Sequence, residues 1–420
     1  MILATTIQFA FRPDGLIHFM QDGYDLPRGP LGLLLYLPFV GLFWLIRPKY
    51  RTAYLILSSL LLSLITLGHG YTLAIAALAI IGLIFVREFA IPARPWPGIA
   101  ILTVIYAALL YCPQPSWLPP VEKPFYFYLH WAGIGFIFLK TVHVIFDVSN
   151  GKLPAPTTGG FLAYLLFAPT LRMGPIYRYD DFSQQLQDNH LRNLKIGGGL
   201  LRIFVGLVRL GIMAVVMDKF PFDTLFANPQ NMSFGQMMPL LYAAPMSIYL
   251  WISGYIDLSI GIGRLMGFRV PENFNYPWRA TSIAEFWRRW HITLGAWLRD
   301  YLYIPLGGNR RHVPINYIII FLFTAVWHGT YLGYICWGLS QGIGMTVWRY
   351  WSRYWQKQRE NNTQFYRIFA RARLVNSPIN IGLAWLLSFH YQIVTIAWFM
   401  DENHQLRLVG QRFIELLGFN

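Results

Sequence analysis

Charged side chains are scarce in this sequence of 420 residues. Only 13% of the residues are charged, whereas 55% are hydrophobic, and the mean hydropathy is +0.40. A soluble domain carries about 25% charged residues. Apolar runs of about 20 residues recur along the chain, each long enough to cross ~30 Å of hydrocarbon as a helix. The composition therefore predicts an all-α membrane protein with several spans.

Cysteine is almost absent. Cys112 and Cys336 lie in apolar segments, without a CxxC motif or a Cys/His spacing typical of zinc sites. We therefore expect no disulfide framework and no metal site, and a packing role for Cys336. A GxSxG elbow is missing, so a serine nucleophile of the α/β-hydrolase type has no support. No cleavable signal peptide is evident, and residues 1–27 are expected to lie at the membrane interface.

Acidic residues are outnumbered by basic ones, 19 against 34, which gives a net charge of +15. The basic residues cluster in a few loops, as the positive-inside rule expects for the cytoplasmic side. Arg47–Arg51 and Arg87–Arg94 are two such loops, and the joint between them, Gly68–Gly70, carries no fixed charge. We therefore expect the N-terminus outside, and a lipid bilayer rather than nucleic acid as the partner.

The apolar runs define the expected membrane segments. With approximate bounds, the predicted spans are Leu31–Ile46, Ala53–Leu67, Tyr71–Val86, Pro97–Tyr111, Pro124–Val148, Gly197–Met217, Met237–Met266 and Ile379–Met400. Phe161–Pro175 is short and rich in helix breakers, which predicts a re-entrant or tilted segment. The tail Asn403–Leu417 is expected to form an interfacial helix. Together with the hairpin described next, this makes about 10–11 membrane-embedded helices.

The apolar run Tyr317–Val347 contains His328, its only side chain that changes charge near neutral pH. Basic segments flank the run on both sides, so it must enter and leave the membrane from the cytoplasm. About 31 residues give two legs of roughly 15, too short for two crossings at 1.5 Å per residue. We expect a hairpin that turns near Gly329-Thr330, with His328 at its tip.

An imidazole inside a membrane has two interpretations. His328 could be a structural histidine, hydrogen-bonded to a neighbouring helix. However, an ionisable residue is expensive in hydrocarbon and usually marks a site or a pathway. A buried, neutral imidazole also suits general-base catalysis near neutral pH. We therefore favour a functional role for His328.

The most polar region, residues 271–311, is expected to be cytoplasmic. Ser282 and Glu285 match a capping box at the start of a helix, and Glu285 can pair with Arg289 one turn later. The periodicity predicts one amphipathic helix that continues to Leu298 and carries His291 one turn after Trp287. This helix either lies at the interface without further role or lines the entrance to a site.

Several polar residues of this region are candidate contacts of an anionic substrate. Arg288, Arg289 and Arg299 could hold phosphate groups of an acyl donor, and Asn309 lies in a Gly-Gly-Asn-Arg-Arg turn that could bind an anion. Upstream, Asp257 lies in an apolar run, where we expect it to pair with a basic or hydroxyl group.

Four motifs carry a family resemblance. They are PENFNYPWRATSIAEFWRRWHITLGAWLRDYLYIPLGGNR, VWHGTYLGYICWGLSQG, GYIDLSIGIGRLMGF and RMGPIYRYDDF. In this order they resemble the membrane-bound O-acyltransferase family, from about Phe161 to Gly344, and the IPLGGNRR loop resembles the bacterial branch that O-acetylates alginate and other polysaccharides. The branch that transfers D-alanine to teichoic acid is more distant.

The resemblance implies a fold and a chemistry. The fold would be a ring of helices around a tunnel, in one membrane domain with N-terminal spans in 1–150, the motif core in 161–347 and C-terminal helices in 348–420. His328 matches the catalytic histidine of the WHG motif, and His291 matches a second characteristic polar position. The acyl donor would be acetyl-CoA or a carrier-protein thioester, with no bound cofactor, and a periplasmic esterase-like partner could complete the transfer.

Two alternatives remain open. The first is D-alanyl transfer by the same machinery. The second is a proton-coupled transporter without acyl chemistry, because buried histidine and aspartate suit a proton relay. The absence of an inverted repeat and the concentration of polar motifs on one face count against the transporter.

Overall fold

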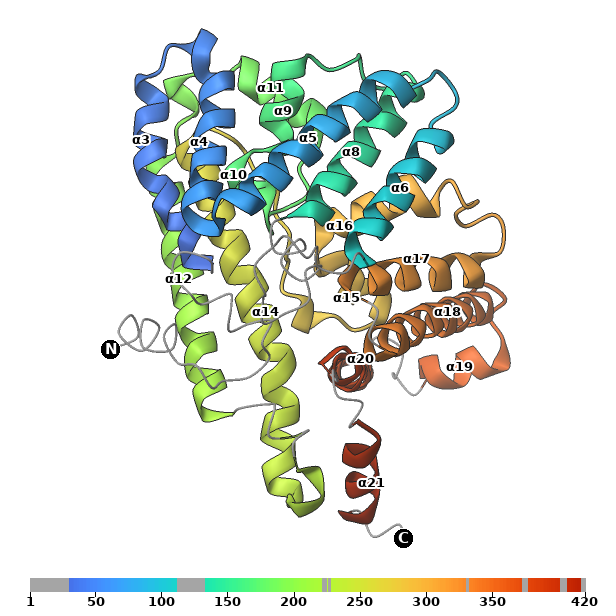
Figure 1. Ribbon diagram of the computed structural model, residues 1–420. Coiled ribbons are helices and arrows are strands. Elements are labelled where there is room, and N and C mark those ends of the chain that lie inside the picture. Colours follow the sequence, from blue (N-terminus) through green and yellow to red (C-terminus); the bar gives the residue numbers. More distant parts are fainter. Residues whose placement is uncertain are drawn as a thin grey trace. The chain divides into compact units, whose positions relative to one another are not determined.

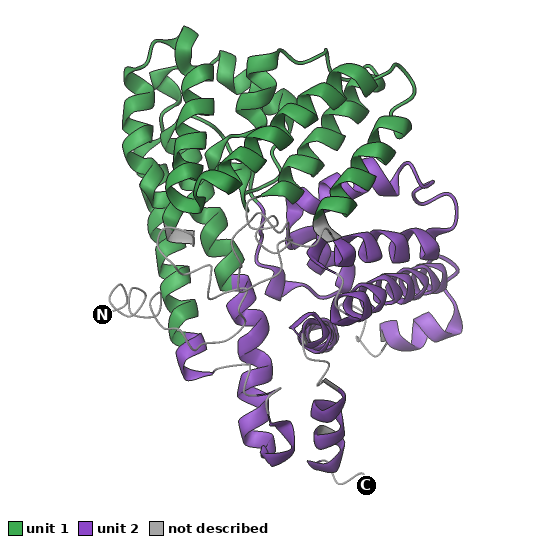
Figure 2. Cartoon of the chain, viewed as in Figure 1, with its two compact units in different colours: residues 1–215, 250–272 green, residues 216–249, 273–420 purple. Residues whose placement is uncertain are grey.

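The computed structural model describes residues 30–111, 133–220, 225, 228–329, 332–371, 377–400 and 406–416. All regular elements in these residues are helices, which confirms the all-α prediction for this part of the chain (Figure 1). The chain forms two compact units, residues 1–215 with 250–272 and residues 216–249 with 273–420 (Figure 2). Each unit is described by itself.

The first unit contains the N-terminal helices and the middle of the chain. Its α-helices are α3 (Leu37–Leu45), α4 (Arg51–Leu67), α5 (His69–Phe89), α6 (Trp96–Tyr111), α8 (Ile134–Ser149), α9 (Thr158–Leu165), α10 (Ala168–Leu171), α11 (Tyr179–Gln187), α12 (Ile196–Lys219) as far as Val215, and α14 (Phe234–Leu265) from Leu250. Short 3₁₀ turns cover Pro30–Tyr36, Pro48–Tyr50 and Leu191–Asn193. The expected span Pro124–Val148 is described only from its α8 part onward.

Helix α8 is the centre of this unit. It packs against α5, α6 and α9, and nearly all of its side chains are buried. A helix that is covered all round must satisfy its polar groups internally. Lys140 does so by donating to the Tyr164 carbonyl (3.2 Å) and to Thr170 Oγ (3.0 Å).

The segment predicted to be re-entrant or tilted forms two short helices rather than a span. Helix α9 ends at Leu165, and α10 covers only Ala168–Leu171. The Lys140 ammonium contacts both pieces, because Tyr164 lies on α9 and Thr170 on α10. The break follows from the proline at the start of α10, which cannot donate a backbone hydrogen bond.

Asp257 on α14 is paired, as the sequence predicted. Arg202 and Arg209 of α12 reach its two carboxylate oxygens at 2.6 and 2.7 Å. The two helices approach closely at glycines: a Cβ on Gly206 would lie 2.7 Å from the Gly254 carbonyl oxygen. Small residues at the crossing allow helices to pack backbone to backbone in a membrane.

The second unit contains the remaining elements. These are α15 (Ile283–Arg289), α16 (Ile292–Leu298), a π-helical stretch (Arg299–Tyr303), α17 (Val313–His328), α18 (Leu332–Glu360), α19 (Gln364–Arg371), α20 (Pro378–Met400), α21 (Leu406–Leu416), and the portions of α12 and α14 from Val216 and up to Tyr249. Short 3₁₀ turns cover Pro229–Asn231 and Pro277–Arg279. Helix α21 lies within the tail predicted to be helical.

The predicted hairpin is present in this unit. Helix α17 ends at His328, and α18 begins at Leu332 and packs along α17. The second leg is longer than expected, because α18 continues past Val347 through a polar, basic stretch to Glu360. Two glycines one turn apart on α18 allow the close approach: a Cβ on Gly338 or Gly342 would lie 2.7 Å or 2.9 Å from the α17 backbone.

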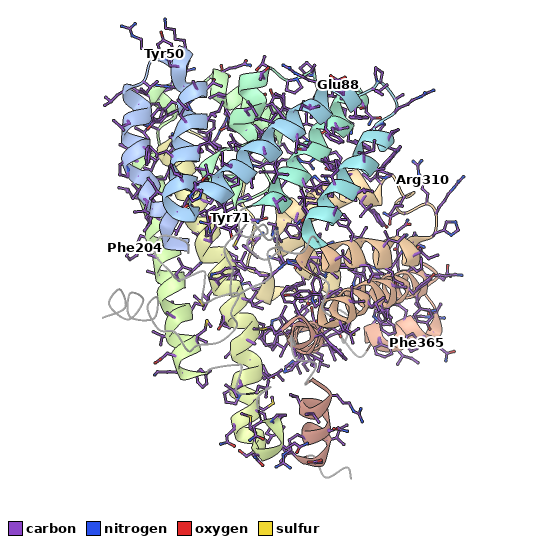
Figure 3. The ribbon with its side chains drawn as sticks, in the orientation of Figure 1. Tyr50, Tyr71, Glu88, Phe204, Arg310 and Phe365 are labelled. Atoms are coloured by element: carbon purple, nitrogen blue, oxygen red, sulfur yellow. The ribbon has the colours of Figure 1, made fainter. Side chains whose placement is uncertain are left out.

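Four described helices are long and apolar enough to span a membrane. They are Pro48–Leu67, His69–Phe89, Ile196–Lys219 and Pro378–Met400, and shorter apolar helices cover Gly32–Leu45, Trp96–Leu109 and Val313–His328. Large apolar side chains on these helices face outward. Phe204 on α12 is 63% exposed and points away from its unit (Figure 3), and Leu387 on α20 is 73% exposed. Such surfaces fit lipid contact.

Candidate active site

His328 is the last residue of α17, and Gly329 ends the helix. The Gly329 N–H donates to the carbonyls of Ala325 and Val326, and its backbone has φ 154°. A Cβ at this position would lie 2.8 Å from the Tyr334 ring. Both facts require glycine after the histidine. The WHG sequence therefore ends the helix sharply and leaves the imidazole half-buried at the hairpin turn.

Aromatic rings surround the His328 imidazole. Ring centroids lie 5.0 Å away for Trp327 and Phe399, 6.2 Å for Trp337 and 6.3 Å for Tyr334. The ring of Phe399 belongs to α20 and also contacts Tyr334 and Trp337. These neighbours reduce the exposure of the imidazole to water, so a group placed here would react in an apolar setting.

Trp287 of the WRRWH motif connects this hairpin to α15. Its indole contacts the rings of Phe321 (4.9 Å) and Trp337 (5.9 Å), and its Nε1 donates to Gln341 Oε1 at 3.0 Å. Gln341 is fully buried and donates in turn to Thr395 of α20 (2.8 Å). The motif that carries His291 and the motif that carries His328 therefore pack on one another within this unit.

The single helix predicted from Ser282 to Leu298 is wrong. Helix α15 ends at Arg289, and α16 begins at Ile292, with His291 between them in the left-handed region (φ 47°, ψ 51°). Consequently His291 is not one helical turn from Trp287. A left-handed backbone is uncommon for a non-glycine residue and is found preferentially at functional sites.

The break is stabilised by hydrogen bonds with Asn273 and Asn275, which precede α15 in the chain. The Ile292 N–H donates to the Asn273 carbonyl, and the Asn275 N–H donates to the Arg289 carbonyl, both at 2.9 Å. These bonds replace helical ones at the break. Asn273 also contacts the histidine itself, with its Nδ2 3.3 Å from His291 Nδ1. Burial lowers the pKa of His291 to about 4.

The start of α15 follows the sequence prediction. Ser282 accepts a hydrogen bond from the Glu285 N–H (3.2 Å), and Glu285 pairs with Arg289 at 2.7 Å. The reciprocal bond differs from a standard capping box, because the Glu285 carboxylate accepts from the N–H and hydroxyl of Thr281 (both 2.9 Å). Burial acts to raise the pKa of Glu285, but the bonds from Thr281 and Arg289 lower it below its ordinary value.

The four predicted donor-binding residues have different surroundings. Arg289 is engaged by Glu285 and by the Asn275 carbonyl, and Arg299 pairs with Asp300 at 2.7 Å. Asn309 accepts from the Tyr303 hydroxyl (2.7 Å) and from Arg349 (2.6 Å). Arg288 is exposed on α15. The donor-binding role of these residues stays a prediction.

The Gly-Gly-Asn-Arg-Arg loop is held from within. Gly307 and Gly308 have φ 103° and 53°, and the buried amide of Asn316 donates to the Gly308 and Arg311 carbonyls. Arg310 extends from this loop into solvent (Figure 3). The loop therefore presents exposed cations on a fixed backbone, as an anion-binding turn would.

Other ionisable groups in the apolar helices have partners of their own. His390 on α20 donates from Nδ1 to the Leu386 carbonyl (2.8 Å), and its Nε2 accepts from the Tyr242 hydroxyl (2.6 Å). Asp257 is paired with two arginines, as described above. These fixed arrangements do not favour a proton relay. In the described residues, His, Cys, Asp and Glu form no group of three that could hold a metal ion.

Sequence inspection missed two neighbours of the candidate histidines. Asn273 belongs to the PENFN stretch, whose only signal was its place beside the polar motif. Phe399 lies at the end of the last apolar span, where an aromatic residue is unremarkable. Nothing in the local pattern of either residue indicates contact with His291 or His328.

The chain was then compared with known proteins. The model of the MBOAT, membrane-bound O-acyltransferase family, matches residues 152–400. A "Probable alginate O-acetylase AlgI" of Pseudomonas fluorescens is 33% identical over 92% of this chain and 74% of its own length. The protein of the same description from Pseudomonas syringae pv. tomato is 33% identical over 68% of this chain.

Two other kinds of enzyme are also similar. A "Peptidoglycan O-acetyltransferase" of Helicobacter pylori is 35% identical over 62% of this chain, and a "Teichoic acid D-alanyltransferase" of Bacillus subtilis is 29% identical over 57%. The chain spans about half the length of several of these relatives: 52% of the Pseudomonas syringae protein and 47% of the Helicobacter protein. Over the matched regions, the acetylases are more similar to this chain than the D-alanyltransferase is.

Proposed function

Because the chain belongs to the membrane-bound O-acyltransferase family and is a multi-pass membrane protein, we propose that it transfers an acyl group, most simply acetyl, from a cytoplasmic thioester. The acceptor is a hydroxyl of a cell-envelope polysaccharide or a periplasmic esterase-like acyltransferase partner. The membrane is the bacterial plasma membrane. The higher identity to acetylases than to the D-alanyltransferase supports acetyl over D-alanyl.

The observation that carries this proposal is the setting of His328. The imidazole ends α17 at a hairpin turn, among four aromatic rings, where the chain would otherwise be apolar. As general base, His328 takes the proton of the acceptor hydroxyl while the oxygen attacks the thioester carbonyl. The C–O bond forms, the C–S bond breaks, and the leaving thiolate recovers the proton from the imidazolium.

The position of His328 on its helix favours this role. Backbone carbonyls at the C-terminal end of α17 give that end a partial negative charge. The charge stabilises the imidazolium that forms during the transfer. An acyl-enzyme on His328 is a different mechanism for the same overall reaction. It would be detected as acyl-histidine trapped from a donor-only incubation.

The donor is acetyl-CoA or the thioester of a carrier protein, and no bound cofactor is needed. Cations on the polar segment, Arg288 on α15 and Arg310 and Arg311 on the loop, are exposed and therefore accessible to donor phosphates. Arg289 and Arg299 form ion pairs with Glu285 and Asp300, so a donor phosphate that binds them competes with these carboxylates.

The test is His328→Ala in the full chain, with envelope O-acetyl groups released by alkali and quantified. We expect a loss of about 100-fold or more. The matched control is His312→Asn, because His312 is exposed and its left-handed backbone (φ 47°) suits asparagine. Membrane insertion is checked for both variants.

Mass spectrometry of the modified polymer separates the alternatives. Acetyl groups that disappear in His328→Ala but persist in His312→Asn support the proposal. Detection of D-alanyl esters in place of acetyl groups would indicate that the chain is a D-alanyltransferase. Unchanged O-acetyl content in His328→Ala, with normal insertion, would exclude His328 as the base.

A further inference from the structure

Asn273 holds His291 through a hydrogen-bond network with a fixed direction. Its side-chain Oδ1 lies 2.9 Å from both the backbone N and the Oγ of Thr293, and its Nδ2 lies 3.3 Å from His291 Nδ1. Asn273 is fully buried, and Thr293 is only 8% exposed. Together with the half-buried His291, they form one polar cluster at the break between α15 and α16.

The orientation of the Asn273 amide follows from its partners. A backbone N–H can only donate, so the Asn273 atom that faces the Thr293 nitrogen must be the carbonyl oxygen. The NH₂ group must then face His291. An NH₂ group can only donate as well, so His291 Nδ1 must accept and carries no proton. The proton of the neutral ring is therefore on Nε2.

We propose that Asn273 is a positioning residue that keeps His291 neutral, with its proton on Nε2, so that His291 acts in acyl transfer as a hydrogen-bond donor and not as a second base. This inference rests on the proposed acyl transfer. In that reaction the thioester carbonyl becomes an oxyanion when the acceptor oxygen attacks. His291 Nε2–H donates to this oxyanion and keeps its proton, while His328 carries the transferred proton.

The electrostatics agree with this assignment. Protonation of His291 would place an Nδ1–H directly against the N–H of Asn273, so the cluster disfavours the imidazolium. Burial acts in the same direction and outweighs a hydrogen bond to the residue's own backbone, which acts to raise the pKa, so the pKa of His291 is lowered to about 4. At neutral pH the ring has a single N–H, which is the state that a donor requires.

The first experiment reads the tautomer without turnover. The full chain is labelled with ¹⁵N-histidine in detergent micelles, and the His291 signals are assigned by their loss in His291→Gln. We expect a neutral ring protonated on Nε2 between pH 6 and 8. A ring protonated on Nδ1, or a doubly protonated ring, would overturn the inference.

The second experiment replaces the hydrogen-bond donor that faces His291 with an acceptor. Asn273→Asp keeps the shape and can still accept from Thr293, but it offers His291 an acceptor in place of a donor. We expect the proton to move to Nδ1, kcat to fall about 100-fold as after loss of an oxyanion-hole donor, and KM to change little. An unchanged tautomer with unchanged kcat would contradict the proposal.

A double-mutant comparison separates positioning from structural damage. The side-chain amide of glutamine can supply an N–H near the place of Nε2, so His291→Gln should retain more activity than His291→Ala. In the His291→Gln background, Asn273→Asp should cost little, because the tautomer no longer matters. An equal penalty in both backgrounds would show that Asn273 acts only on the fold.

Two controls complete the design. Asn316→Asp alters another buried amide, which bonds to the Gly308 and Arg311 carbonyls, and it should leave the His291 spectrum unchanged. Thr293→Val removes the hydroxyl but keeps the N–H that orients Asn273, so the tautomer should persist. If the wild type transfers no acyl group yet shows the Nε2–H tautomer, the proposed function fails and the His291 assignment stands. If the wild type is active but shows an Nδ1–H tautomer, the His291 assignment fails and the proposed function stands.

Discussion

The hairpin that presents His328 depends on Gly338, and Gly338→Ala tests this directly. A Cβ at Gly338 would lie 2.7 Å from the Phe321 carbonyl oxygen and 2.9 Å from Ala325 Cβ. Comfortable carbon contacts begin at about 3.5 Å, so the legs must separate by roughly half an ångström or more. Backbone atoms of α17 cannot rotate away as the end of a flexible side chain could.

The cost follows from overpacking. Adding a group to a filled interior destabilises a protein by about 1–3 kcal/mol. The alanine also gains about 0.5–1 kcal/mol over glycine in a helix, which lowers the net loss. Gly382→Ala isolates that gain, because Gly382 lies within α20 and a Cβ there would meet nothing within 4 Å. Gly338→Ala should therefore be less stable than the wild type, and Gly382→Ala slightly more stable.

The measurement is thermal unfolding of both variants in the same detergent, followed by acyl-transfer rates at a temperature where both are folded. Separation of the legs moves Trp337, whose ring lies 6.2 Å from that of His328, so kcat should fall in Gly338→Ala alone. If Gly338→Ala unfolds at the same temperature as Gly382→Ala, close packing of α17 on α18 does not limit stability, and the reasoning is refuted.

Two further perturbations test electrostatics. The folded-state pKa of His291 is about 4, below its ordinary 6.5, so the contribution of the neutral ring to stability is fully present above pH 6.5 and is lost as the pH drops toward 4, by at most about 3 kcal/mol. Between pH 7 and 5, the unfolding temperature of the wild type should therefore fall more steeply than that of His291→Gln. Parallel curves for the two proteins would contradict this prediction. Asp257→Ala leaves Arg202 and Arg209 without their buried carboxylate and should lower the free energy of unfolding by about 3 kcal/mol. The control Glu415→Ala breaks the more exposed pair with Arg412 and should lower it by less than about 1 kcal/mol. Equal unfolding temperatures of the two variants would show that the buried pair does not stabilise the protein.

The hairpin could be predicted from the sequence because basic residues flank the apolar run on both sides. Basic segments on both sides of an apolar run too short for two crossings leave few alternatives. The pairing of Asp257 and the cap at Ser282 were also accessible, because one follows from the cost of a buried charge and the other from a local motif. Each of these predictions depends on a local motif or on the charge and hydropathy of one segment, both of which can be read from the sequence.

The break at His291 could not be predicted in the same way. The residues before and after it keep the apolar pattern of one helix, and periodicity does not register a single left-handed residue. The break exists because Asn273 and Asn275, earlier in the chain, supply hydrogen bonds to the open ends of α15 and α16. The approach of Phe399 to His328 is likewise tertiary, with no local signal.

In the proposed mechanism, the two histidines take different roles because they lie at opposite ends of their helices. His328 stands at the C-terminal end of α17, where the helix dipole stabilises a positive charge. His291 precedes the first residue of α16, where the positive end of the helix dipole disfavours a positive charge, and the Asn273 amide adds another donor against the ring. An acyl transfer needs one group that accepts a proton and one that keeps its proton while it stabilises an oxyanion. In the proposed mechanism, the break at His291 gives the two histidines different helix ends and so separates these two tasks.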